Sequence, residues 1–197
     1  MKLILVTEYF HPANNAPGAR FKPLVDKLSE HSFDVTIYTS KISRNVTEYN
    51  VVWNWIKFPS NQKSTLIRLF FELAYGCETF FRLLFSSGDI YYLTSPSFIN
   101  CVLARFYCRL FGKRYVVDIR DDYPRVYFDT GLISRQSWIG KILSGLERGL
   151  YTKADLVIAA TGGLKANIEK ITDRSVWLLR NGFSEKLFYP SVEKDAT

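Results

Sequence analysis

Short apolar runs alternate with helical segments along the 197-residue chain, and this alternation restricts the possible folds more than any other feature. The expected strands are 2–7, 34–39, 51–58, 89–94, 114–119, 155–160 and 175–180, and the expected helices lie near 17–30, 64–86, 97–111, 135–153 and 162–171. Several runs are continuously apolar and β-branched, which is typical of parallel strands covered on both faces. The pattern predicts an α/β, Rossmann-like, doubly wound and mostly parallel sheet of about seven strands with helices on both faces.

The predicted sheet also indicates where a ligand should bind. In doubly wound sheets, ligands bind outside the carboxyl ends of the strands. We therefore expect a functional site in the loops that follow the first, fourth, fifth and sixth predicted strands. The chain length suits one full domain.

The formal net charge of +7 favours anionic partners. Nucleic acid is not expected among them, because the tyrosines and tryptophans lie mostly inside strand patterns rather than between basic residues. Cys77, Cys101 and Cys108 form no C-x-x-C pair, which indicates reduced thiols in a cytosolic protein and no metal site. No segment offers the roughly 20 mostly uncharged apolar residues of a membrane span. Residues 1–10 are typical of a strand rather than a signal peptide.

The loop after the first strand, TEYFHPANNAPGARF, leads into an amphipathic helix. Gly18 would let the backbone approach a ligand closely, and Arg20 adds positive charge near the helix N-terminus, so this loop could contact a phosphate or a sugar. Alternatively, Pro17 and Gly18 only begin the helix. A single glycine does not make the G-x-G-x-x-G fingerprint, so no dinucleotide site is inferred.

The segment 66–85, LIRLFFELAYGCETFFRLLF, is unusually apolar for a helix on one sheet face. Its four charged residues fall on one arc about 120° wide at about 100° per residue. Two interpretations are open: a deeply buried crossover helix, or a helix with part of its surface in a lipid interface. A basic set on the next helix would suit an anionic membrane surface, namely Arg105, Arg109, Lys113 and Arg114.

The stretch 116–124, VVDIRDDYP, ends an apolar strand with a cluster of charges. If Val117 and Ile119 face the core, then Asp118 and Arg120 share the other face of the sheet. The carboxylates could ligate Mg²⁺, although nothing nearby completes such a site. They could also pair with arginine for purely structural reasons. The third interpretation is that a carboxylate and a guanidinium face a polar substrate, because arginine suits phosphate and diol recognition and aspartate can orient or deprotonate a hydroxyl.

Four stretches resemble a known family: YFHPANNAPGARFKPLVDKL with VTIYTS, DIYYLTSPSF, VVDIRDDYP, and LERGLYTKADLVIAATGGLKANI followed by LLRNGFSEKLFYP. In this order they resemble the N-terminal, acceptor-side domain of the family 4 retaining glycosyltransferases, which have the GT-B fold. Within this family they resemble the branch that makes bacterial surface polysaccharides. The resemblance implies a domain over 1–190, the start of an interdomain linker over 191–197, and a C-terminal donor domain that is absent from this chain.

The resemblance also implies an activity. With its donor domain, the protein would be a hexosyltransferase-type enzyme that moves a sugar from a nucleotide-sugar donor to a polyprenyl-linked acceptor in capsule, O-antigen or similar biosynthesis. It would be cytoplasmic, peripheral at the inner face of the membrane, and independent of metal or other cofactors, and residues 1–197 alone would be inactive. The alternative is a stand-alone acceptor-binding and membrane-docking subunit of a split enzyme.

The site residues follow from the same resemblance. Asp121 is expected to orient or deprotonate the acceptor hydroxyl. Arg120 stands where many relatives have a histidine, so its catalytic role is left open. The expected substrate-binding residues are Gly18, Arg20, Ser95, Asp118, Thr161 and Gly162. Ser32 and Phe33 replace a usual Gly-His pair at a turn away from the cleft.

Overall fold

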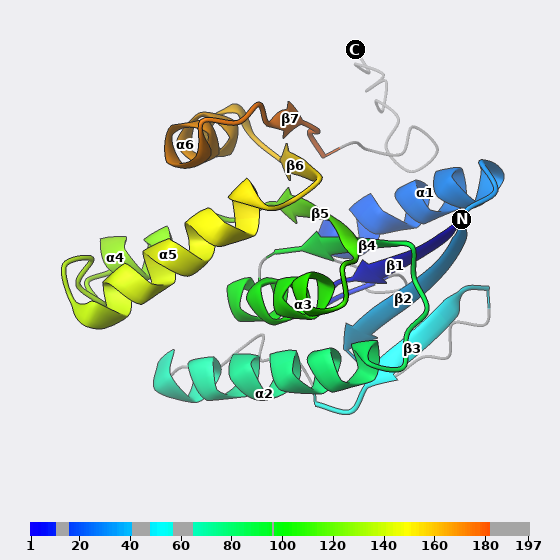
Figure 1. Cartoon of the computed structure of the whole chain (residues 1–197), viewed down its shortest axis with the longest axis horizontal. Coiled ribbons are helices and arrows are strands. Elements are labelled where there is room, and N and C mark those ends of the chain that lie inside the picture. The colour runs from blue at the N-terminus through cyan, green and yellow to red at the C-terminus, as the bar shows by residue number, and fades with distance from the viewer. Residues whose placement is uncertain (11–15, 41–47, 57–64, 96, 182–197) are drawn as a thin grey trace, which may run out of the picture.

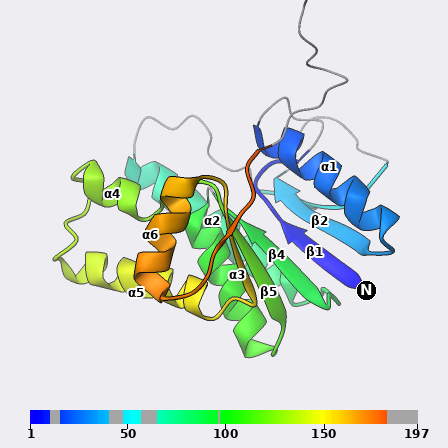
Figure 2. The ribbon, with the colours of Figure 1, turned by 90° about the horizontal axis from the view of Figure 1, so that it is seen from above.

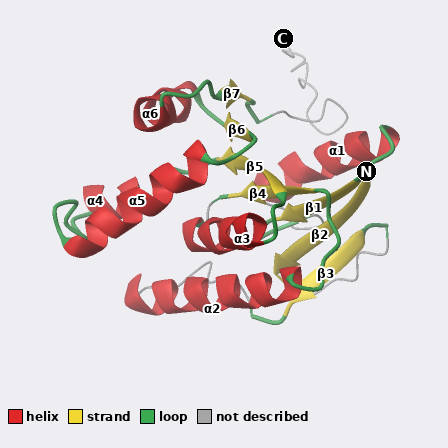
Figure 3. Ribbon diagram, in the orientation of Figure 1, coloured by secondary structure: helices red, strands yellow, loops and turns green. Residues whose placement is uncertain are grey.

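The computed structural model describes residues 1–10, 16–40, 48–56, 65–95 and 97–181. Its centre is a seven-stranded, entirely parallel sheet of order β3-β2-β1-β4-β5-β6-β7. The strands are β1 (Lys2–Val6), β2 (Asp34–Ser40), β3 (Asn50–Asn54), β4 (Ile90–Thr94), β5 (Arg114–Ile119), β6 (Leu156–Ala159) and β7 (Trp177–Leu178). Figure 1 and Figure 3 show the strands between the helical layers. The predicted Rossmann-like fold is confirmed.

Helices cover both faces of the sheet, as predicted. They are α1 (Ala16–Glu30), α2 (Thr65–Leu83), α3 (Phe98–Leu110), α4 (Arg125–Asp129), α5 (Trp138–Thr152) and α6 (Gly162–Thr172). Figure 2 shows α1 on one side of the sheet, with α3, α5 and α6 on the other. The helix α2 packs against α3 and so extends that second layer.

The strands are apolar on both faces because each face has its own core. Along β1, Leu3 and Leu5 pack with the apolar face of α1, whereas Ile4 and Val6 pack with the layer of α3 and α5. This explains why the strand reads as a continuous apolar run rather than an alternating one. The strand β5 follows the predicted orientation, because Val117 and Ile119 belong to the α3 side.

Several predicted boundaries change. The strand β7 has only two residues, because Trp177 and Leu178 lie exposed at the sheet edge, and β3 ends at Asn54 rather than at 58. The helix predicted over 135–153 begins at Trp138, where the Ser137 hydroxyl caps it by accepting the Gly140 amide at 3.1 Å. The short helix α4 was not predicted. Residues 182–190 of the expected domain and the expected linker 191–197 lie outside the described residues.

Candidate functional site

The strand order places the carboxyl ends of β1 and β4 side by side at the point where the chain changes direction across the sheet. The chain leaves β1 toward α1 on one face and leaves β4 toward α3 on the other. Ligands of open α/β sheets bind at such switch points. The residues that follow these strands therefore form the candidate site.

Hydrogen bonds join the loops after β1, β4 and β5 into one edge. The Ser95 hydroxyl accepts the amide of Arg120 at 2.8 Å and the amide of Asp121 at 3.3 Å. The Glu8 carboxyl accepts the amide of Ser97 at 2.5 Å. The structure thus brings Ser95, Arg120 and Asp121 together, and the Ser95 hydroxyl fixes the loop that carries the other two.

Arg20 and Asp118 form a buried bidentate ion pair between α1 and β5. The guanidinium donates from Nε and Nη2 to the two carboxylate oxygens at 3.0 and 3.1 Å, and the Tyr92 hydroxyl adds a third bond at 3.0 Å. Burial raises the pKa of Asp118, although Arg20 and Tyr92 oppose this rise. The Arg20 Nη1 also reaches the carbonyl of Leu179 and the side chain of Asn181. This pair matches the structural interpretation of the cluster, and substrate binding by either residue stays a prediction.

Arg120 has unused hydrogen-bonding capacity at the edge. It is half-buried, and neither Nε nor Nη1 has a hydrogen-bond partner. Its guanidinium lies 5.8 Å from the ring centroid of Phe21. Burial lowers the pKa of Arg120, and the nearby Asp118 and Asp121 oppose that effect. These two nitrogens are buried from solvent, so the positive charge of Arg120, rather than these donors, is what the edge offers to an anionic group.

The remaining predicted residues lie at the same edge or next to it. Asp121, Thr161 and Gly162 are exposed, and a Cβ on Gly162 would meet nothing within 4 Å. The Thr161 hydroxyl caps α6 by accepting the Leu164 amide at 3.2 Å. Gly18 lies in the first turn of α1, and its surroundings fall outside the described residues. Its expected convergence with Asp121 and Thr161 therefore stays a prediction.

Glu8 is a site residue that the sequence analysis missed. Its side chain is fully buried, and burial raises its pKa to about 8, with Glu72 adding to the rise and the Ser97 amide and Arg120 opposing it. The second carboxyl oxygen, Oε2, has no partner. An acid directly after an apolar strand, in a loop where ligands bind, was the available signal.

The helix α2 buries polar side chains beside apolar ones on its inward side and exposes apolar side chains on its outward side. Glu72, Tyr75 and Thr79 are at most 1% exposed. The Tyr75 hydroxyl donates to the Thr7 carbonyl at 3.2 Å, and Asn54 donates to the Thr79 hydroxyl at 2.7 Å. The outward face and the turn after it expose large apolar side chains, namely Ile67, Phe70, Phe71, Leu73, Phe81, Leu84 and Phe85. The interpretation of a deeply buried crossover helix is therefore wrong for this face.

The basic set predicted beside α2 is only partly available. Arg105 is buried, with its guanidinium against Gly149 of α5, so its predicted place on the surface is wrong. Arg114 pairs with Asp155 at 3.4 Å, and Lys113 donates to the Gly88 carbonyl at 3.2 Å. Arg109 is exposed near the end of α3.

Two other sequence expectations concern cysteines and membrane spans. All three cysteines are free thiols, and Cys101 and Cys108 are buried. Within the described residues, no group of three or more histidine, cysteine or acidic side chains could hold a metal ion. None of the helices that the structure describes combines the length and apolarity needed to cross a bilayer.

The fold and the edge define a class of protein: a doubly wound α/β domain with a candidate ligand site at the switch point of its sheet. No protein-family model matches the chain. The chain is 22% identical over 204 residues to a protein of Pseudomonas aeruginosa named "Probable glycosyltransferase WbjE", covering 99% of this chain and 51% of that protein. This relative supports the sequence resemblance to glycosyltransferases.

Solved structures show the same fold. Sucrose-phosphate synthase from Thermosynechococcus elongatus superposes with a TM-score of 0.69 at 12% identity, covering 98% of this chain and 51% of that one. A second structure of that enzyme from the same organism gives a TM-score of 0.58 at 7% identity, covering 93% of this chain and 90% of that one. The chain thus spans about half the length of the first relatives that it matches.

Proposed function

We propose that this chain is the acceptor-side half of a retaining glycosyltransferase of GT-B type, related to family 4. With a second domain that binds the donor, it would transfer a sugar from a nucleotide sugar to a lipid-linked saccharide in surface polysaccharide biosynthesis. The main observation in support is the edge at which Ser95 holds Arg120 and Asp121 beside the switch point. The relative of Pseudomonas aeruginosa supports the choice of activity.

In this proposal Asp121 acts on the acceptor. It is exposed, so a sugar hydroxyl can reach its carboxylate, which would orient that hydroxyl or take its proton as the glycosidic bond forms. The positive charge of the half-buried Arg120 guanidinium would attract an anionic part of the substrates. Protein dipoles and basic groups would stabilise the leaving diphosphate without a metal ion.

The outward face of α2 would bring the enzyme to its lipid-linked acceptor. Phe70, Phe81 and Phe85 are 67%, 62% and 90% exposed on this face. Phe106, Leu110 and Phe111, of α3 and its C-terminal end, are also exposed, with Arg109 beside them. An apolar face with a basic residue at its border suits peripheral binding to an anionic membrane surface at the cytoplasmic side.

The catalytic assignment is tested by Asp121→Asn in the enzyme that carries both domains. The expected result is a fall in kcat of roughly 10²–10⁴-fold, because the general base is lost. Asp34→Asn is the matched control, since Asp34 is an exposed acid at the amino end of β2, the opposite end of the sheet from the candidate edge. Turnover that is the same in both variants and the parent would show that Asp121 is not the base.

Membrane binding is tested by flotation of residues 1–197 with vesicles of phosphatidylglycerol and phosphatidylethanolamine. The double variant Phe70→Ser/Phe81→Ser should bind at least roughly tenfold more weakly, because each buried phenylalanine contributes about 2 kcal/mol. Trp177→Ser is the control, since Trp177 is 67% exposed on β7. Equal binding by the parent and the double variant would contradict a lipid contact through α2.

A second candidate function is a stand-alone subunit that docks the acceptor and the membrane for a separate catalytic partner. The same outward face of α2 favours it. In that case the phenylalanine substitutions would still weaken vesicle binding, but Asp121→Asn would leave the turnover of the partner unchanged. The two measurements together distinguish the candidates.

A further inference from the structure

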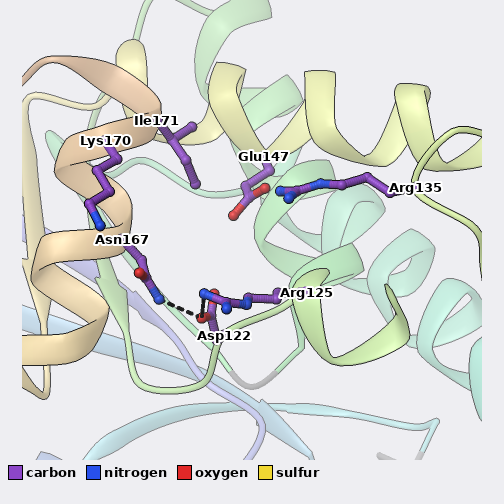
Figure 4. A pocket seen from close by; sticks show the side chains of 7 residues that line it. All are labelled: Asp122, Arg125, Arg135, Glu147, Asn167, Lys170 and Ile171. Carbon is purple, nitrogen blue, oxygen red and sulfur yellow. Dashed lines mark hydrogen bonds and ion pairs between the residues drawn. The ribbon is translucent and has the colours of Figure 1, made fainter. Parts of the chain in front are cut away.

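A second hollow lies outside the ends of β5 and β6, away from the Arg120 edge. It is a pocket of about 230 Å³, and its walls come from the loop after β5, α4, the segment before α5, α5 itself and α6. Figure 4 shows Arg135 and Glu147 extending toward each other on one side of this pocket and Arg125 beside Asp122 on the other. No step of the proposed reaction uses these residues.

The cations of this pocket exceed the carboxylates that neutralise them. Asp122 is already engaged, because it accepts the Asn167 amide at 3.0 Å and pairs with Arg125 at 3.6 Å. Arg125 pairs in addition with Asp129 at 3.3 Å. Arg135 and Lys170 have no carboxylate within 4.0 Å in the described part of the chain. Two uncompensated positive charges therefore line one small cavity.

Glu147 does not cancel this excess fully. Only 4% of the residue is exposed, and burial raises its pKa to about 7, with Asp122 adding to the rise and Arg135, Tyr151 and Arg125 opposing it. At neutral pH a large share of the Glu147 carboxyl is therefore protonated. A protonated carboxyl donates a hydrogen bond, which an anionic oxygen can accept.

Apolar side chains also border the charged pocket. Ile171 of α6 lines it, and Val126 of α4, which follows the lining residue Arg125, is 38% exposed. The Tyr127 hydroxyl of α4 also donates to Glu72 at 3.4 Å, which ties this region to α2 and its apolar outer face. A ligand that combines an anionic group with an apolar chain fits this arrangement of charged and apolar surface.

We propose that the pocket lined by Arg135, Lys170 and Arg125 binds a phosphate or diphosphate group, the one that joins the lipid to the saccharide of the acceptor. The source of this group rests on the proposed function, whereas the chemistry of the pocket does not. The lipid chain would then lie over Ile171 and the exposed Val126 of α4. The pocket thus recognises the linkage of the acceptor, while Asp121 acts on its sugar.

The first experiment measures inorganic diphosphate binding to residues 1–197 by calorimetry. The double variant Arg135→Gln/Lys170→Gln should bind at least tenfold more weakly, and because both side chains are exposed it should keep the fold, which circular dichroism checks. Lys141→Gln is the matched control, an exposed lysine of α5 that does not line the pocket. No binding by the parent, or equal binding by the parent and the double variant, would overturn the pocket.

The second experiment separates the lipid source from free phosphate. A short-chain isoprenyl diphosphate should bind at least tenfold more tightly than inorganic diphosphate, and Val126→Ser should reduce that advantage while leaving inorganic diphosphate binding unchanged. Equal affinities for the two probes would overturn the lipid source. Since neither measurement depends on turnover, failure of the transferase assignment and failure of this pocket are distinguishable.

Discussion

The buried Glu8 carboxyl should make this protein less stable as the pH rises, and Glu8→Gln should remove that loss. The folded protein holds the Glu8 proton up to a pKa of about 8, whereas the ordinary value is 4.5. Between these two values the folded state binds more protons than the unfolded state, so the free energy of unfolding falls as the pH rises. Below pH 4.5 both states carry the proton, and the contribution is then fully present.

The size of the effect follows from the two pKa values. Each pH unit between them costs about 1.4 kcal/mol, so this carboxyl removes about 3 kcal/mol of stability by pH 7 and about 5 kcal/mol by pH 8. These figures are upper bounds, because water entering the loop would reduce the penalty. Glutamine keeps the oxygen that accepts the Ser97 amide and cannot ionise, so the variant avoids the loss.

The assay is urea unfolding of residues 1–197 at several pH values between 5 and 8. The parent should lose stability across this range, and Glu8→Gln should lose less by about 2 to 4 kcal/mol. Glu48→Gln is the matched control, because Glu48 is exposed and the same neutral amide replaces its carboxylate. A Glu8→Gln variant with the same pH dependence as the parent would refute the claim that burial raises the pKa of Glu8.

Two further predictions concern stability. Arg20→Ala should lower the free energy of unfolding by about 3 to 5 kcal/mol, because it leaves the buried Asp118 carboxylate without its ion-pair partner. Lys27→Ala, at the exposed pair with Glu30, should leave the stability nearly unchanged, and equal losses of the two variants in urea unfolding would contradict the burial. Gly140→Ala should destabilise the protein by more than about 1 kcal/mol, because the new Cβ would lie 2.3 Å from the Ser134 carbonyl oxygen. Gly145→Ala has nothing within 4 Å of its Cβ and should stabilise the same helix by about 0.5 to 1 kcal/mol. Melting curves that rank the two variants the other way would refute the packing at the start of α5.

The sequence predicted the sheet and its parallel strands, because these follow from local pattern and from the handedness of crossovers. It could not predict that Arg20 and Asp118 pair, since the two residues are 98 positions apart and each could equally have faced a substrate. The residue types indicate which interactions Arg20 and Asp118 can make, but which residues they pair with depends on how α1 lies across β5. For the same reason, three carboxylates in VVDIRDDYP could not be sorted into buried and exposed ones.

The direction of α2 was also beyond the sequence. The sequence assigned the charged and the apolar residues to separate arcs of the helix surface, but this does not show which arc faces the rest of the protein. The residues of a helix that face the core are usually apolar. In α2, Glu72 and Thr79 also face the core, where Tyr127 hydrogen-bonds to Glu72 and Asn54 to Thr79. Glu8, which faces Glu72, was missed because a lone acid after a strand gives no periodic signal.

The outward apolar side of α2 has a practical consequence for handling the protein. Since Tyr75, Thr79 and Glu72 fix the helix from within, the aromatic side chains on its outer surface contribute little to the folded state. Replacing Phe70, Phe81 and Phe85 with lysine or glutamate should therefore yield material that stays monodisperse without detergent, at nearly unchanged melting temperature. The exposed aromatic side chains of α2, which would hinder purification, are therefore the residues that can be replaced with the least loss of stability.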